Sequence, residues 1–189
     1  MPIITESAIT LNFPDNNYFR FENCEGYKLI KNNFKEMDVC WYEQASDTLY
    51  IIELKDWGNN TLKEENDPNV SAEQIEHMKK GISADRINNL WKKSVDSVSM
   101  FMSILLNKPY AANIQACSPF TITHTTTIKL LSIINWTSLD PTYISTINSE
   151  YKSRFKSYAK LYDITTFAVM TKKQASEKFS WICKEDELK

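Results

Sequence analysis

A hairpin signal in the first third of the chain restricts its fold more than any other feature. Two runs of β-branched, aromatic and other apolar residues, 37–44 and 48–56, flank a short polar turn at Ala45-Ser46, which is typical of an antiparallel β-hairpin. The second run contains the segment LYIIEL, in which apolar and polar residues alternate poorly. Such a strand is usually covered on both faces, so we expect both strands at or near the centre of a sheet.

The register of this hairpin places charged residues together. The strands can be connected by a two-residue turn or by a four-residue loop. Both alternatives give the same pairing, in which Asp38 lies opposite Glu53. Opposed side chains in a hairpin have Cβ atoms about 5 Å apart. Lys55 points to the same face because it follows Glu53 by two residues, and Glu36 shares that face with Asp38. The sequence therefore predicts two or three carboxylates and one ammonium group at one end of the hairpin.

The remaining segments alternate between strand and helix patterns. Residues 17–23 and 27–31 are rich in aromatic and β-branched residues, and we expect them to be strands. The later segments are, in order, an amphipathic helix at 83–106, a strand at 127–136, a helix at 141–161, a strand at 164–170 and a last helix capped by Thr171.

This order of elements indicates the fold class. Strands followed by alternating helices and strands are typical of an α/β protein, here with a central mixed sheet flanked by helices. The strand–helix–strand steps are expected to be parallel and right-handed. Residues 58–72 are polar and rich in structure breakers, so we expect a long surface loop there. No linker divides the chain, and we expect one domain over residues 1–189.

The scarcity of several residue types excludes common kinds of active site. The chain has three glycines and two histidines, too few for a phosphate-binding glycine loop or an HExxH metal site. Its four cysteines have no CxxC spacing, and we expect reduced thiols in a cytoplasmic protein. No apolar stretch reaches the roughly 18 residues of a membrane-spanning helix, and no secretory signal is visible at the start. A membrane partner is therefore not expected.

The charged residues of the hairpin have two interpretations. Like charges opposite each other destabilise a hairpin, and a divalent cation would relieve the repulsion between Asp38 and Glu53, because Mg²⁺ is commonly held by one or two carboxylates. Mg²⁺ or Mn²⁺ is therefore the expected cofactor, with Asp38, Glu53 and Glu36 as its ligands. The alternative is structural: Glu53 and Lys55 form an ion pair, and Asp38 is solvated at the end of its strand.

The stretch 36–57, EMDVCWYEQASDTLYIIELKDW, resembles the core hairpin of the PD-(D/E)xK nuclease-like superfamily. The signature of that superfamily is an acid on one strand and (D/E)-x-K on the next, which Asp38, Glu53 and Lys55 match. The resemblance implies a restriction-endonuclease-like three-layer sandwich and a metal-dependent hydrolase, an endonuclease that cleaves DNA with these three residues as its catalytic group. The order of the later elements also fits the superfamily.

The chain departs from the superfamily pattern at two points. Met37 occupies the position of the name-giving proline. Many members carry another acid on a preceding helix, whereas residues 1–35 are expected to form mostly strands and loops. Glu22, Glu25 or Glu36 would replace that acid, and the sequence does not distinguish among them.

The charge of the chain is divided unevenly along its length. Residues 1–70 contain 13 acidic and 6 basic residues, a balance of −7, and residues 71–189 contain 11 and 16, a balance of +5. The candidates for contact with the DNA backbone lie on the two long helices: Lys92 and Lys93 on the first, and Lys152, Lys156 and Lys160 on the second. The alternative for both groups is a solvated helix face.

Two functions other than DNA cleavage remain open. The acidic pI of about 5.8 favours a non-catalytic module for nucleic-acid or protein interaction on the same fold over a free-standing DNA-binding protein. A small nuclease would instead find its target by forming a homodimer or by binding a protein partner. A further interpretation is an α/β enzyme that acts on a nucleotide or another small phosphorylated substrate.

Overall fold

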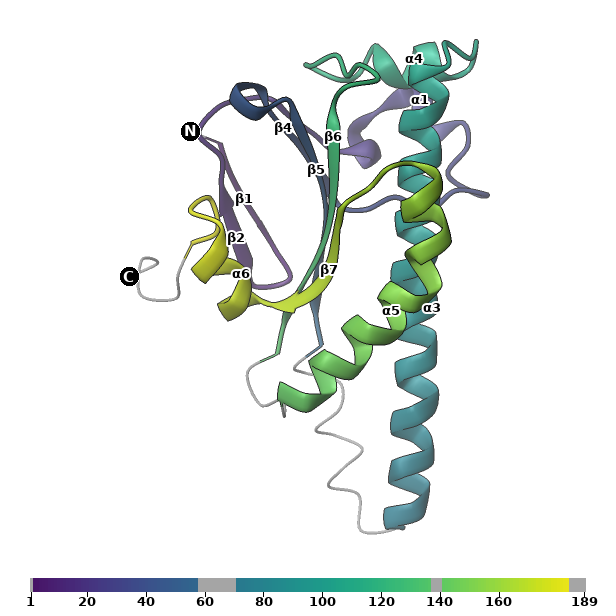
Figure 1. Cartoon of the computed structure of the whole chain (residues 1–189), viewed down its shortest axis with the longest axis vertical. Helices are drawn as coiled ribbons and strands as arrows, with labels where there is room; N and C mark the ends of the chain where they lie inside the picture. The colour runs from purple at the N-terminus through teal and green to yellow at the C-terminus, as the bar shows by residue number, and fades with distance from the viewer. Residues whose placement is uncertain (1, 58–70, 137–140, 184–189) are drawn as a thin grey trace.

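A five-stranded mixed sheet forms the middle layer of the protein (Figure 1). The structure is a computed structural model that describes residues 2–57, 71–136 and 141–183 of the 189-residue chain. Neighbouring strands are antiparallel from β3 to β5 and parallel from β5 to β7, which confirms the prediction of an α/β protein with a mixed sheet. In sheet order the strands are β3 (Tyr18–Phe19), β4 (Val39–Glu43), β5 (Thr48–Asp56), β6 (Thr127–Asn135) and β7 (Thr166–Thr171).

The central hairpin forms as its sequence predicts. β4 and β5 pair in the expected register, with Val39 opposite Ile52. In this register Asp38 and Glu53 form the next pair beyond Val39 and Ile52. The connection is a short 3-10 turn followed by Asp47 in the left-handed conformation, which is the four-residue form of the loop. β5 is the middle strand of the sheet and is buried over most of its length.

Helices cover one face of the sheet (Figure 1). They pack against the odd-numbered side chains of β5, such as Leu49 and Ile51. Because side chains alternate along a strand, Glu53 and Lys55 point to this same helical layer. Its members are α1 (Glu25–Lys28), α3 (Ala72–Leu105), α4 (Ala111–Gln115) and α5 (Pro141–Leu161).

A second, smaller hairpin covers the opposite face together with a short helix. The hairpin consists of β1 (Ile3–Glu6) and β2 (Ile9–Asn12), and the helix is α6 (Lys172–Lys178). Tyr50 and Ile52 of β5 pack there with Trp181. We expected helices on both faces of the sheet, but the buried apolar residues of β2 supply much of the cover on this side.

Most of the later elements have the expected bounds. α5 begins and ends at the predicted residues. α3 ends at Leu105, one residue before the predicted end, but begins at Ala72 rather than at residue 83. The predicted loop 58–72 falls almost entirely outside the described residues. Thr171 caps α6 as expected, through reciprocal side-chain and backbone hydrogen bonds with Gln174. Within the ranges that the structure describes, no helix has the length and apolar character needed to cross a bilayer.

The segment before the central hairpin differs from the sequence prediction. We expected strands at 17–23 and 27–31, but only Tyr18–Phe19 is a strand, and residues 25–28 form the short helix α1. Tyr27 is buried in the core beneath the helical layer. Aromatic residues favour strands on average, but this preference mainly reflects packing on a sheet. Here the packing partner is another helix, so the local preference does not decide the structure.

α1 packs tightly on α4, and a disulfide joins the two segments. A Cβ atom on Gly26 would lie 2.5 Å from the backbone carbonyl carbon and oxygen of Asn113, so this contact requires glycine. Cys24 and Cys117, 93 residues apart in the sequence, are bonded here, and the other two cysteines are free. The prediction of four reduced thiols is therefore wrong. Disulfides are rare where thiols are kept reduced, so this pair does not support the predicted cytoplasmic location.

Candidate functional site

Three of the predicted site residues converge at one end of the central hairpin. Asp38 lies just before β4, and Glu53 and Lys55 lie on β5. The Lys55 ammonium is 2.7 Å from Glu53 Oε1 and 3.7 Å from Asp38 Oδ2. The backbone N–H of Leu54 donates to Asp38 Oδ2 at 2.7 Å and holds that carboxylate against β5. The structure therefore brings the two acids and the lysine together, while their catalytic role stays a prediction.

A second lysine completes this group from the helical layer. Lys93 of α3 places its ammonium 2.7 Å from Glu53 Oε1, 3.0 Å from Glu53 Oε2 and 3.3 Å from Asp38 Oδ1. Its side chain is only 20% exposed. Lys93 therefore lies with the acids, whereas the sequence prediction grouped it with the candidates for contact with DNA. We call Asp38, Glu53, Lys55 and Lys93 the charged cluster.

The neighbouring Lys92, which the sequence prediction grouped with Lys93, lies in a different environment. Lys92 points outward, with its side chain 43% exposed, and pairs with Asp96 at 2.8 Å. An α-helix has 3.6 residues per turn, so successive side chains point about 100° apart. The packing of α3 against the sheet therefore turns Lys93 toward the acids and leaves Lys92 at the surface.

Burial within the charged cluster is strongest at Glu53, whose side chain has no exposed surface. Burial and the carboxylate of Asp38 raise the pKa of Glu53 to about 7, against the lowering effect of Lys93 and Lys55. Burial by itself lowers the pKa of Lys93, but Glu53 and Asp38 outweigh it, and the net shift is upward. The negative charges of the two carboxylates are balanced by the positive charges of the two ammonium groups. Lys93 thus supplies the charge compensation that we expected from a metal ion.

Hydrogen bonds between α3 and the segment before β4 hold the charged cluster in place. The Asp96 carboxylate accepts the backbone N–H of Lys35, and Ser97 Oγ accepts that of Met37, each at 2.8 Å. Asp96 and Ser97 lie about one turn beyond Lys93 on the same helix. The helix that brings Lys93 to the site therefore also positions the strand segment that carries the first acid.

Three buried polar side chains lie beside the charged cluster without a strong sequence signal. Ser94 Oγ and the Tyr151 hydroxyl share a hydrogen bond of 2.8 Å in the core. Ser132 lies beside Glu53 in the pairing of β5 with β6. Its buried Oγ has no hydrogen-bond partner among the described residues. A single polar residue within the apolar run of β6 is the only sequence feature that points to Ser132.

The candidates for an additional acid have other partners. Glu36 accepts a hydrogen bond from the Tyr27 hydroxyl, and Glu22 and Glu25 form ion pairs with nearby basic residues. Within the described part of the chain, no group of three or more His, Cys, Asp or Glu side chains is arranged to hold a metal ion. The contacts of Glu36 therefore do not support its predicted role as a third metal ligand.

An arginine between two tryptophans lies where the central strands end. The Arg86 guanidinium carbon is 4.7 Å from the ring centroid of Trp57 and 5.0 Å from that of Trp136. Trp57 follows Lys55 by two residues, and Trp136 follows the end of β6. Arg86 and Lys93 are seven residues apart, about two helical turns, so they share one face of α3. The spacing by itself does not show that this face of α3 points inward.

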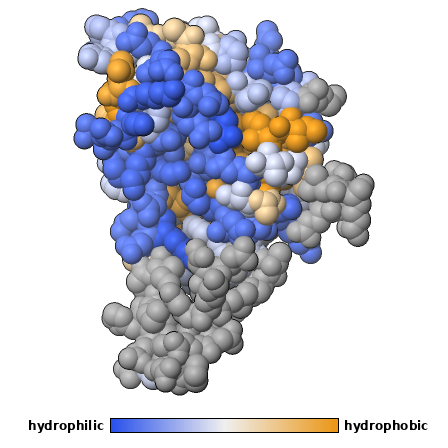
Figure 2. Space-filling view, turned by 180° about the vertical axis from the view of Figure 1, so that it is seen from behind, coloured by the Kyte–Doolittle hydropathy of each residue, from blue (hydrophilic) through white to orange (hydrophobic). Residues whose placement is uncertain are grey.

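The lysines that we expected to face DNA on α5 are exposed. Lys152, Lys156 and Lys160 are exposed on α5, and each directly follows a buried residue of the same helix: Tyr151, Phe155 and Ala159. Figure 2 shows the molecule from behind, and the described residues on that face are mostly hydrophilic with some apolar patches. Exposure of these lysines is compatible with contact to a phosphate backbone and equally with an ordinary solvated face, so their role in DNA binding stays a prediction.

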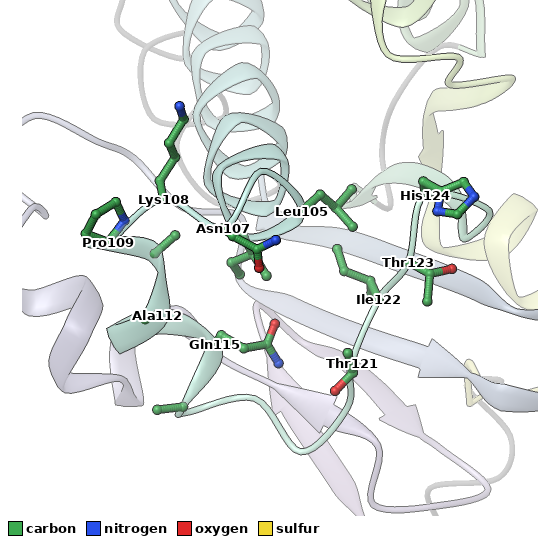
Figure 3. A pocket seen from close by; sticks show the side chains of 13 residues that line it. Leu105, Asn107, Lys108, Pro109, Ala112, Gln115, Thr121, Ile122, Thr123 and His124 are labelled. Atoms are coloured by element: carbon green, nitrogen blue, oxygen red, sulfur yellow. The ribbon is translucent and has the colours of Figure 1, made fainter.

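A pocket of about 680 Å³ lies at the other end of the sheet (Figure 3). Leu105, Gln115 and His124 line it, from the end of α3, from α4 and from the loop before β6. That loop leads to Thr127, which pairs with Thr48 at the start of β5. The charged cluster lies five to seven residues farther along β5, about 17 to 23 Å away at the usual rise of a strand. The pocket is therefore separate from the charged cluster.

Comparisons with known proteins found no relative of this chain. No protein-family model, curated protein or solved structure matches it. The resemblance to the PD-(D/E)xK superfamily therefore rests on the hairpin, on the order of the elements and on the geometry of the charged cluster.

Proposed function

We propose that this protein is a metal-dependent nuclease that hydrolyses DNA phosphodiester bonds on a restriction-endonuclease-like fold. The observation that carries the proposal is the convergence of Asp38, Glu53 and Lys55 at one end of the central hairpin, with the ammonium 2.7 and 3.7 Å from the two carboxylates. A fully buried carboxylate adds little to the stability of a protein. Proteins in which a buried ion pair is replaced by well-packed hydrophobic residues are often equally stable or more stable. A strongly perturbed pKa with specific charged neighbours is typical of functional groups.

The two acids are arranged to hold a cation. The Lys93 ammonium occupies a position that oxygens of both Glu53 and Asp38 contact, at 2.7 to 3.3 Å. Carboxylate oxygens are also the groups that commonly bind Mg²⁺ in proteins. The hydroxyl of Ser132, which finds no partner in the described ranges, is a further buried oxygen beside Glu53. Asp38 and Glu53 are thus the residues that would hold Mg²⁺ or Mn²⁺.

The two acids and Lys55 have different tasks in this proposal. A bound divalent cation supplies positive charge that polarises the phosphoryl group. Asp38 is fixed by the Leu54 N–H and Glu53 by burial, so both carboxylates have the rigidity that a site of tight geometry needs. Lys55 is the most exposed member of the cluster, at 32% of its side chain. Its ammonium orients the attacking water and stabilises negative charge that develops on the phosphate.

The outer face of α5 is the proposed contact for the DNA backbone. Its lysines, Lys152, Lys156 and Lys160, are exposed and share one side of the helix. Lysines that neutralise phosphates release counterions, so the affinity for DNA should fall as salt is raised. Because the chain as a whole is slightly acidic, a second copy of the chain or a protein partner would add to this contact.

A non-catalytic interaction module on the same fold is the second candidate. The observation that favours it is the charge balance of the cluster, in which Lys55 and Lys93 compensate Asp38 and Glu53 without an added ion. In that case the network of charges holds α3 against the hairpin and has no further function. Dependence on a divalent metal separates the two candidates, because only the nuclease requires it.

Cleavage of single-stranded, double-stranded and branched DNA with Mg²⁺, Mn²⁺ or a chelator tests the proposal. We expect metal-dependent cleavage by the wild type, no cleavage by Glu53→Gln, and a rate about 10² to 10³ times lower for Lys55→Ala. Glu43→Gln is a matched control, because Glu43 lies at the other end of the same hairpin. A wild type that neither cleaves DNA nor responds to metal contradicts the nuclease and leaves the interaction module. Competition by mononucleotides would instead indicate a small phosphorylated substrate.

A further inference from the structure

Lys93 bridges the two carboxylates of the charged cluster. Its ammonium lies 2.7 and 3.0 Å from the oxygens of Glu53 and 3.3 Å from Asp38 Oδ1. Lys55 reaches Glu53 at 2.7 Å but stays 3.7 Å from Asp38. Lys93 is therefore the group that stands where one cation contacts both acids.

The Lys93 side chain can leave this position without moving the acids. It comes from α3, whereas Asp38 and Glu53 belong to the central hairpin. The hydrogen bond from the Leu54 N–H holds Asp38 against β5 and does not involve Lys93. The Lys93 side chain is 20% exposed, and a lysine has a flexible four-carbon stem, so the ammonium has a route to solvent.

We infer that Lys93 is an internal counterion that competes with the divalent cation for the position between Asp38 and Glu53, and that metal binding releases it. The inference rests on the proposed function and deepens it, because it names what controls metal binding at that site. An ammonium and a divalent cation repel each other, so a metal ion placed between the two carboxylates disfavours the Lys93 ammonium at that position. The acids accept metal only in the fraction of molecules in which Lys93 is withdrawn, which weakens the apparent affinity in proportion.

Titration of the metal-free protein with Mn²⁺ or Mg²⁺ alone, without DNA, tests this inference. Binding is followed by calorimetry and by the rise in Tm that a bound metal causes. Lys93→Gln keeps a polar side chain and removes the charge, and it should bind the metal about tenfold or more tightly than the wild type. Lys92→Gln is the matched control, since it removes the same charge from the same helix but from an ion pair with Asp96. Its affinity should stay within about twofold of the wild type.

Two results of this titration would overturn the inference. One is equal metal affinity in Lys93→Gln and the wild type. The other is tight binding that persists when Glu53→Gln is added to Lys93→Gln, because the metal then lies elsewhere. A second measurement needs no variant: amine labelling of Lys93 in the wild type, quantified by mass spectrometry relative to Lys92, should rise when Mn²⁺ is added. A labelling ratio that metal leaves unchanged also overturns the release of Lys93.

Failure of the inference and failure of the proposed function give different results. A wild type that cleaves DNA with metal, together with a Lys93→Gln variant that gains no metal affinity, retains the nuclease and removes the counterion role. A gain of metal affinity in Lys93→Gln, with no cleavage by the wild type, supports the counterion role and contradicts the nuclease.

Discussion

Replacing Lys93 with Met should destabilise the metal-free protein, and the loss should grow with pH. Burial and Asp38 raise the pKa of Glu53 from 4.5 to about 7, and Lys93 is one of the two lysines that oppose this rise. The Lys93→Met variant lacks that opposition, so the pKa of Glu53 should rise above 7. The carboxylate of Asp38 also loses one of its two lysine neighbours.

The sign and the size of the effect follow from proton linkage. Because the pKa of Glu53 is higher in the folded than in the unfolded chain, its favourable contribution to stability is present below about pH 4.5 and is lost as the pH rises through about 7. In Lys93→Met this loss continues to higher pH. At about pH 8.5 the additional loss reaches at most about 2 kcal/mol, from 1.36 kcal/mol per pH unit over about 1.5 units. At about pH 5 Glu53 is protonated in both proteins, and its contribution to the difference is near zero.

Urea unfolding of the wild type and Lys93→Met at these two pH values measures the difference. Lys92→Met is the control, and its effect on stability should depend little on pH because Lys92 contacts Asp96 and not Glu53. Adding Glu53→Gln to Lys93→Met should remove the pH-dependent part of the loss, since the titrating group is then absent. The same loss at both pH values, or a double variant that keeps the pH dependence, refutes the reasoning.

Three further predictions concern other parts of the molecule. Gly26→Ala should lower the free energy of unfolding by about 1 to 3 kcal/mol, because its Cβ would lie 2.5 Å from the backbone of α4; unchanged stability in urea would contradict that close contact. Arg86→Lys should cost about 0.5 to 2 kcal/mol in the same assay, since lysine lacks the planar group that stacks on Trp57 and Trp136; a neutral result would show that the stacking contributes nothing. Changing Lys152, Lys156 and Lys160 together to Glu should weaken DNA binding and reduce its salt dependence without unfolding the protein; unchanged affinity would place the DNA contact elsewhere.

The central hairpin is determined by its own sequence. A side-chain period of two and a short loop set its register, so the meeting of Asp38, Glu53 and Lys55 on one face follows from residues 38–55 alone. The later helices and strands also follow from local patterns. α5 has the predicted bounds because its apolar residues recur at helical spacing within the segment itself.

Contacts between distant segments decided what the local patterns could not. Residues 27–31 carry a strand pattern, but packing against α4 makes residues 25–28 a helix. The bond between Cys24 and Cys117 joins positions 93 residues apart, and nothing in the spacing of the cysteines indicates it. The cover of the second sheet face likewise depends on where the β1–β2 hairpin docks, which its own sequence does not specify.

The composition of the charged cluster is the clearest case of this division. Lys92 and Lys93 are adjacent on a helix with 3.6 residues per turn, and the sequence offers no reason to separate them. The rotation of α3 about its axis is set by the burial of Ile87, Leu90 and Val98 in the core, and this rotation turns Lys93 onto acids 40 and 55 residues earlier in the chain. The sequence by itself determined that two carboxylates face each other. Only the tertiary structure decided that an ammonium stands between them, because charges interact through space and not along the chain.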